Sequence, residues 1–324
     1  MSSTVVLKAR TFNDPADRLF KLIDQLELRY RRQFLEMVVA IKDELTIKRL
    51  TQLIETGRID TALNLANAHI TRFATQINQG YVTAGNSTAD AISGVVSVTF
   101  DQTNFRAVEV MRNNRLNIIR EFTASQRDAS RQAMIEGISE GLNPRAQAVM
   151  FRDSIGLTGN QQAAVSNYKK LLESNSTESL TRRLRDRRFD STVQNAIRDG
   201  RPLTSSQIKR MVERYQDRYL RYRSEAIART EALSNVSEGS HEMYRQAYDD
   251  GMLDPEEVTR RWNTRLDGDE RDSHNAMHGQ VRGALEPFIS GDGNQLMHPG
   301  DRSAPGEDRV QCRCAVSTRI RSKK

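Results

Sequence analysis

The chain of 324 residues carries 49 Lys and Arg against 42 Asp and Glu, which gives a formal net charge of +7. No apolar run approaches the ~18 residues that a membrane span requires, and the N-terminus lacks the apolar segment of a secretory signal. Two cysteines one residue apart cannot build a disulfide framework. These features predict a protein kept in a reducing cytoplasm, or in something assembled there, with no membrane partner.

Residues 1–140 are predicted to form a helical arm or docking region. A helix is expected to begin at Asn13-Asp14-Pro15, where a polar cap precedes a proline suited to the first turn. Apolar residues then recur every three or four positions, without glycine or proline before Gly57, which predicts one long amphipathic helix. We expect its apolar face to contact another protein through Leu26, Tyr30, Met37 and Ile41.

A second helix is expected from Asp60 to about Gly80, and it would form an antiparallel hairpin with the first. Residues 85–103 interrupt the periodicity with glycines and the β-branched run VVSVTF, which fits either a short strand or a turn. Helical spacing returns over residues 104–140.

Residues 141–250 are predicted to be a helical region with three starts. These are Asn143-Pro144, Thr158, and a capping box formed by Thr204 and Gln207. After about Gly251, frequent glycine and proline predict a compact part, 251–324, rich in loops and short strands. The expected fold is therefore mainly α, with an elongated N-terminal helical hairpin or bundle and a small C-terminal α+β domain.

Two arginine-rich stretches are candidates for nonspecific contact with double-stranded DNA. One is the segment 182–188, and the other would lie on one face of a helix over residues 210–221. The alternative is a solvated surface, because acidic residues lie nearby in both stretches. The arginines concerned are Arg182, Arg183, Arg185, Arg187, Arg188, Arg210, Arg214, Arg218 and Arg221.

His274, His278, Cys312 and Cys314 form the other candidate site. Together they could supply a tetrahedral Cys₂His₂ zinc set, although C-x-C is tighter than the usual spacing of zinc-binding cysteines. In a strand, both sulfurs would point to one face and Arg313 to the other. A Cys–His nucleophile pair is a second possibility, and packing in a small domain is a third. Packing is the favoured interpretation, because such short motifs often occur by chance. No cofactor is therefore predicted, and zinc stays the alternative.

The last hundred residues resemble the Mu F-like phage head morphogenesis family. The resemblance rests on the ordered pieces ARTEALSNVSEGSHEMYRQA (228–247), RRWNTRLDGDERDSHNAMHGQV (260–281) and PFISGDGNQLMHPGDRSAPGEDRVQCRCAV (287–316). The stretch that begins at residue 141 is also similar to the helical region ahead of this motif, so the resemblance covers about residues 141–318. The positions that fill the family pattern are Arg229, Glu231, Trp262, Asp267, Arg271, His274, Gly279, Gln280, Pro299, Gly300, Asp301, Cys312, Arg313 and Cys314. At His278 the family often has an acidic residue, which argues against His278 as a fixed metal ligand.

The resemblance implies a minor head protein of a tailed bacteriophage, located in the virion near the portal and in the host cytoplasm during assembly. Its implied partners are the portal protein and other capsid or scaffold proteins, and its roles are head assembly, DNA packaging or DNA ejection. An alternative is a nonspecific DNA-binding internal or ejected protein. A third is a virion-borne enzyme or toxin, but residues 1–140 show no catalytic set, so no enzymatic activity is expected.

Overall fold

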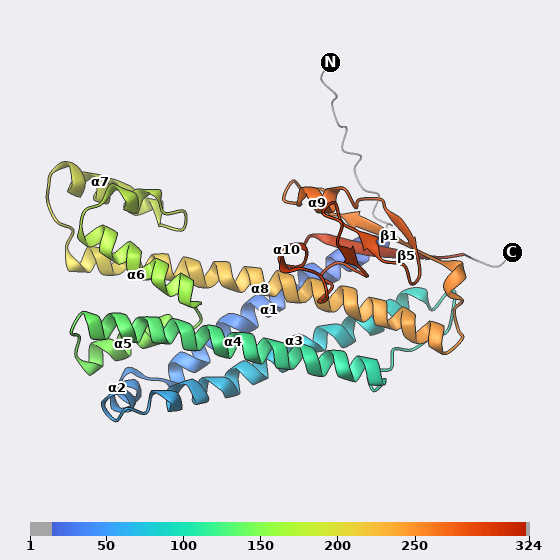
Figure 1. Cartoon of the computed structure of the whole chain (residues 1–324), viewed down its shortest axis with the longest axis horizontal. Helices are drawn as coiled ribbons and strands as arrows, with labels where there is room; N and C mark the ends of the chain where they lie inside the picture. Colours follow the sequence, from blue (N-terminus) through green and yellow to red (C-terminus); the bar gives the residue numbers. More distant parts are fainter. Residues whose placement is uncertain (1–14, 322–324) are drawn as a thin grey trace, which may run out of the picture. The chain divides into compact units, whose positions relative to one another are not determined.

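The computed structural model describes residues 15–321, and within this range the chain is mainly helical with a small C-terminal sheet region (Figure 1). The α-helices are α1 (Pro15–Glu44), α2 (Ile47–Glu55), α3 (Ile59–Ile92), α4 (Phe105–Ser139), α5 (Pro144–Ser154), α6 (Gly159–Glu173), α7 (Asp190–Arg198), α8 (Ser205–Asp249), α9 (Asp272–Asn275) and α10 (Gly306–Arg309). Short 3₁₀ turns occur at Thr177–Thr181, Arg187–Phe189 and Pro255–Glu257. The predicted fold class is confirmed.

The contacts within the chain divide it into two compact units, each built from separate stretches of sequence. Of the described residues, unit 1 comprises 15–30, 76–112 and 226–321, and unit 2 comprises 31–75 and 113–225. The four longest helices, α1, α3, α4 and α8, each contribute a segment to both units. The domain boundaries predicted after residues 140 and 250 are a different division and stay predictions.

The first helix is shorter than predicted, because the chain breaks at residues 45–46. The Thr46 hydroxyl accepts a hydrogen bond from Arg49 N at 3.3 Å and caps the separate helix α2. A capping threonine satisfies an N–H group at the helix start, so it ends one helix and begins another without glycine or proline. Pro15 lies in α1, while Asn13 and Asp14, which carry the predicted cap, lie outside the described residues.

The second predicted helix does not end near Gly80 but continues to Ile92. A Cβ atom at Gly80 would overlap the Tyr30 hydroxyl, so this glycine permits close approach of α1 instead of ending α3. The Tyr30 hydroxyl donates to Ile77 O at 2.6 Å and accepts from the Asn235 amide at 3.1 Å. Within unit 1 the pairs Arg18–Ser87 and Tyr30–Ile77 show that α1 and α3 run antiparallel, as predicted.

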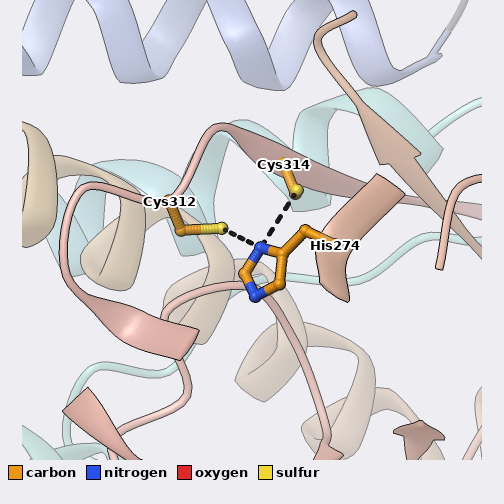
Figure 2. A group of neighbouring side chains, drawn as sticks. All are labelled: His274, Cys312 and Cys314. Carbon is orange, nitrogen blue, oxygen red and sulfur yellow. Dashed lines mark hydrogen bonds between the residues drawn. The ribbon is translucent and has the colours of Figure 1, made fainter. Parts of the chain in front are cut away.

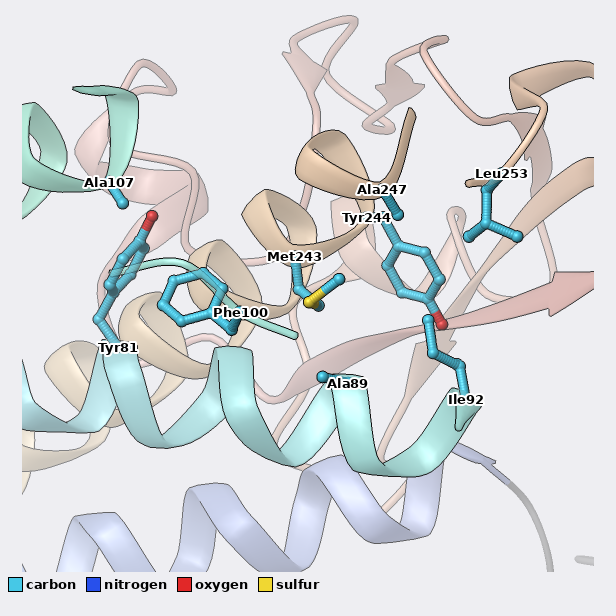
Figure 3. Packing of buried hydrophobic residues seen from close by; sticks show 9 residues of the cluster. All are labelled: Tyr81, Ala89, Ile92, Phe100, Ala107, Met243, Tyr244, Ala247 and Leu253. Carbon is cyan, nitrogen blue, oxygen red and sulfur yellow. The ribbon is translucent and has the colours of Figure 1, made fainter. Parts of the chain in front are cut away.

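The segment after α3 forms no strand within the described chain. The Gln246 side chain donates to Asp101 O at 3.0 Å and accepts from Asp101 N at 2.9 Å, so it takes the bonds that a neighbouring strand would make. Phe100 packs on Gly85, where a Cβ atom would overlap the ring. Phe100 belongs to the unit 1 core with Tyr81 and Met243, which Figure 3 shows between α3 and α8. The VVSVTF run is therefore an extended loop held by side chains.

The three helix starts predicted for residues 141–250 are confirmed. Asn143 caps α5, and Thr158 caps α6 in a capping box with Gln161. Thr204 and Gln207 exchange hydrogen bonds of 2.8 and 3.3 Å at the start of α8. These caps depend on residues within one turn of each other, which is why they can be recognised from sequence.

Unit 2 encloses a buried arginine among aromatic rings. Phe34, Phe73 and Phe122 contact one another with ring centroids 5.5–5.9 Å apart. The Arg223 guanidinium lies 5.1 Å from the Phe122 centroid and donates to Gly156 O at 2.9 Å. Burial lowers the pKa of Arg223 to about 10. Ring faces and a carbonyl oxygen offset part of the cost of burying this charge.

The C-terminal part of unit 1 contains two small antiparallel sheets. Their strands are β1 (Val258–Thr264), β2 (Val281–Gly283), β3 (Phe288–Ile289), β4 (Gln295–Leu296) and β5 (Cys314–Ile320). The larger sheet has the order β2-β1-β5, with Thr264 opposite Cys314, and the smaller one pairs β3 with β4. Three of the five strands have only two or three residues, so side chains and loops must hold much of this part together.

The residues predicted to contact a partner protein are buried inside the chain. Leu26, Tyr30, Met37 and Ile41 pack within the units that contain them, so this prediction is wrong. An apolar stripe indicates only that a helix face is covered, and here other helices of the same chain cover it. Among the described helices, none combines the length and apolar character needed to cross a bilayer.

Candidate metal centre and the polar network around it

Three of the four predicted histidine and cysteine ligands meet at one point in unit 1. The His274 Nδ1 atom lies 3.3 Å from Cys312 Sγ and 3.6 Å from Cys314 Sγ, as Figure 2 shows. The three residues are between 0 and 2% exposed. Their ligand atoms all lie within 4.8 Å of one another. The cluster is therefore compact and enclosed.

Local backbone geometry delivers the two sulfurs to the same side. Gln311 adopts a φ of +57°, which turns the chain between α10 and β5, and its N–H donates to the Thr230 hydroxyl of α8. Cys314 then begins β5, paired with Thr264 of β1. Alternate residues of an extended chain share a face, so Cys312 and Cys314 point to His274 while Arg313 pairs with Asp267. The predicted arrangement of C-x-C is confirmed.

A carboxylate that sequence reasoning missed completes the cluster. Asp308 of α10 is buried, and one of its oxygens lies 3.3 Å from His274 Nε2. Its other oxygen accepts a hydrogen bond from the Asn294 amide at 2.8 Å. Asp308 can accept a hydrogen bond from Nε2–H, and the Nδ1 atom faces both sulfurs. Asp308 is one of 42 acidic residues and lies 34 positions from His274 in the sequence. Nothing in the sequence alone therefore marks it as the partner of this histidine.

His278 lies apart from this cluster. Its Nδ1 atom accepts a hydrogen bond from Thr264 N at 3.1 Å and lies 2.8 Å from the Thr264 hydroxyl. The side chain is exposed, in contrast to His274. The helix α9 is only four residues long, so the H-x-x-x-H spacing does not place both rings on one helical face. Of the four predicted ligands, only three converge.

The charges within the cluster favour one thiolate. Burial alone would raise the pKa of Cys312, but hydrogen bonds from Cys314 and His274 outweigh it and lower that pKa. Burial raises the pKa of Cys314, and the neighbouring Cys312 sulfur raises it further. Burial opposes protonation of His274, but contact with Cys312 raises its pKa overall. The chemistry available is that of a thiolate and a thiol sharing one imidazole nitrogen.

Most other motif residues tie the small domain together or to the helices of unit 1. Trp262 packs its buried ring against His274 and Phe288, at centroid distances of 5.8 and 5.2 Å. Its carbonyl accepts from Gly279 N, where φ is +82°. The Gln280 amide bonds both backbone groups of Ile289. Glycine relieves the strain of the positive φ, and the Gln280 amide satisfies both backbone polar groups of Ile289 in β3.

Ion pairs and turns account for the remaining motif positions. Arg229 pairs with Glu27 at 3.0 Å, and Glu231 pairs with Arg302 at 3.0 Å. The other anchors are Arg271 on the Val310 carbonyl, Asp301 on the backbone N–H groups of Met297 and Ser303, Gly300 against Ser234, and Pro299, whose carbonyl lies 3.2 Å from His298 Nδ1. The motif therefore describes a scaffold whose members hold the loops of the small domain, join it to α8 and join α8 to α1.

Both arginine-rich stretches lie in unit 2. Residues 182–188 form turns in which Arg185 pairs with Asp190 at 2.8 Å. Asp186 is buried and contacts both Arg188 at 2.6 Å and Arg218 at 3.4 Å. The four arginines predicted to share a face of α8 are exposed there, and they are Arg210, Arg214, Arg218 and Arg221. Acidic neighbours thus pair with some arginines, as the solvated-surface alternative expects.

The family assignment rests on the residues that build this scaffold. Residues 187–317 match the model of the family described as Phage Mu protein F like protein. This segment is therefore similar to the Mu F-like family, and we call it the Mu F-like segment. The Mu F-like segment runs from the turn before α7 to β5 and contains every position of the family pattern, from Arg229 to Cys314. Searches of curated proteins and of solved structures gave no match. The likeness inferred for residues 141–186 lies outside the Mu F-like segment and stays a prediction.

Proposed function

We propose that the chain is a noncatalytic minor structural protein of the bacteriophage head, which binds the portal protein inside the capsid and acts in head assembly. The Mu F-like segment carries this proposal, because that family implies bacteriophage head morphogenesis. Binding to the portal, an internal position near it, and a contribution to DNA packaging or ejection are the finer parts that the proposal adds.

The burial of the cysteine–histidine cluster supports the noncatalytic part of the proposal. Cys312, His274 and Asp308 have the order of a nucleophile, its base and an orienting carboxylate. A substrate must reach the sulfur, however, and these residues are at most 2% exposed. Most of the other motif residues use their polar groups in hydrogen bonds and ion pairs within the chain, which suits a structural part.

A docking surface for the portal requires exposed apolar side chains, and α4 offers a pair in unit 2. Ile135 and Ile138 are exposed and lie three residues apart, so they are neighbours on the same helix face. They replace the buried stripe of α1 as the residues to test. A large apolar side chain in solvent is common by itself, but adjacent ones mark a surface worth testing first.

Co-purification with the portal protein tests the proposal. The full chain should stay bound to the portal after nuclease treatment and at high salt, because apolar contact is not screened. Ile135→Asp with Ile138→Asp should release it, whereas Leu116→Asp, an exposed apolar site elsewhere on α4, should not. Absence of binding at both low and high salt would overturn the portal assignment. Binding unaffected by the Ile135 and Ile138 changes would overturn the choice of surface.

A nonspecific DNA-binding protein inside the head is the second candidate. The exposed arginines of α8 favour it, because Arg210, Arg214 and Arg221 lie within one face of a single helix. Binding through phosphate contacts would fall steeply between about 50 and 200 mM salt. Loss of co-purification after nuclease treatment would favour this candidate over direct portal binding.

A further inference from the structure

We propose that His274, Cys312 and Cys314 hold one Zn²⁺ ion that fastens the C-terminal turn of the small domain to α9. Two independent features of the described residues support it: the separations of the ligand atoms and the hydrogen bonding of the histidine. The proposal does not depend on portal or DNA binding.

The separations fit a tetrahedral ion. With zinc–sulfur bonds of about 2.3 Å and zinc–nitrogen bonds of about 2.0–2.1 Å at a tetrahedral angle, a sulfur ligand and a nitrogen ligand lie about 3.5 Å apart. The observed distances from His274 Nδ1 are 3.3 Å to Cys312 Sγ and 3.6 Å to Cys314 Sγ. An ion between the three atoms therefore needs little movement of the side chains, which already point toward one another in Figure 2.

Hydrogen bonding alone satisfies this cluster poorly. The single Nδ1 atom of His274 faces both sulfurs but can hydrogen-bond only one of them well, as a donor to a thiolate or as an acceptor from a thiol. An ion at that point would use the Nδ1 lone pair and both sulfurs at once. Metal-binding histidines usually donate the other ring N–H to a carboxylate or carbonyl, and Asp308, itself held by Asn294, supplies such an acceptor.

Two sulfurs and one imidazole select a borderline-soft ion, and zinc is the common choice for such a set. Among residues 15–321, no fourth histidine, cysteine or carboxylate joins the group. We therefore expect water in the fourth position. The ion would join residues 38 and 40 positions apart in a domain whose strands are short, so its binding free energy would add to folding.

Metal analysis of the purified full chain, produced in zinc-supplemented medium, tests the proposal. The chain should contain about one zinc, as expected for a mononuclear site. Cys312→Ser, Cys314→Ser and His274→Gln should each lose it, and His278→Ala should keep it. His278 is the matched control, because it lies in the same motif but bonds Thr264. A chain without zinc, or one whose zinc survives Cys312→Ser, would overturn the proposal.

Two further measurements cover variants that fail to fold. After chelation, the unsubstituted chain should bind Co²⁺ with thiolate-to-cobalt charge-transfer absorption and tetrahedral d–d bands; absence of both would overturn the proposal. Asp308→Asn should keep the metal but weaken its affinity by about 10- to 100-fold, as removal of an outer-shell partner does. Unchanged affinity in that variant would overturn the role assigned to Asp308.

Discussion

Two polar clusters in this protein use similar interactions but differ in access to solvent. In unit 1, His274, the two cysteines and Asp308 are all between 0 and 2% exposed. In unit 2, the Asp186 side chain is 2% exposed, but its partners Arg188 and Arg218 are 74 and 42% exposed. The first cluster is closed on every side, whereas the second is a buried anion under cations that reach solvent.

This difference in solvent exposure indicates two roles for charged and polar residues, one in folding or metal binding and one in contact with a partner. A closed cluster cannot meet a large partner, so changes in it should alter folding or metal binding. Exposed arginines contribute little to folding because solvent screens them, yet they remain available to an anionic surface. Substitutions in the two clusters and on α8 can test this separation, beginning with the largest expected effect.

Replacing Trp262 with alanine should destabilise the protein most. The ring is fully buried and lies against His274 and Phe288, so its removal leaves a cavity beside the cluster. The expected loss in free energy of unfolding is about 3–5 kcal/mol. Denaturant unfolding followed by circular dichroism measures it. Phe105→Ala is the control, because Phe105 is 77% exposed and its removal should change stability by less than about 0.5 kcal/mol. Equal effects would contradict the closed character of the first cluster.

Asp186→Asn should have a smaller effect that depends on pH. The hydrogen bonds from Arg188 lower the pKa of Asp186 to about 2. A carboxyl with a lowered pKa stabilises the folded state above its ordinary pKa of about 3.9, and this contribution is lost as the pH falls toward 2. The difference in free energy of unfolding should be at most about 2 kcal/mol, reduced by the exposure of both arginines.

Unfolding of the Asp186 variant and the unsubstituted chain should therefore differ by a constant amount between about pH 5 and 7, and this difference should shrink below about pH 4 and nearly vanish by about pH 2. Asp199→Asn, in the exposed pair with Arg198, is the control and should cost little at any pH. A difference that grows on acidification would have the wrong sign for this interpretation.

The smallest change in stability is expected on the exposed face of α8. Arg210→Gln, Arg214→Gln and Arg221→Gln together should leave the free energy of unfolding nearly unchanged. If this face binds DNA, the plot of log affinity against log salt should flatten by about 0.9 for each phosphate that the variant no longer neutralises. Glutamine at Arg115, Arg127 and Arg131, exposed on α4 in the same unit, is the matched control. Identical salt slopes in both sets would remove the α8 face as the DNA-binding candidate.

The sequence by itself determined the local features and the resemblance to a known family. The caps at Asn143, Thr158 and Thr204 were predictable because each depends on residues within one helical turn. The shared face of Cys312 and Cys314 followed from the alternation of an extended chain. The ordered motif pieces led to the Mu F-like family, which the match over residues 187–317 supports.

Only the tertiary structure decided which distant groups meet. Gly80 and Gly85 resemble helix ends in the sequence, but they admit Tyr30 and Phe100 within a continuous helix. The stripe containing Leu26 could have faced a partner or the chain itself, and packing settled it. Likewise Asp308, and not His278, adjoins His274. The spacing of residues in the sequence determines which side chains are neighbours within one helix or strand. Contacts between residues far apart in the sequence depend instead on how the whole chain buries its apolar surface.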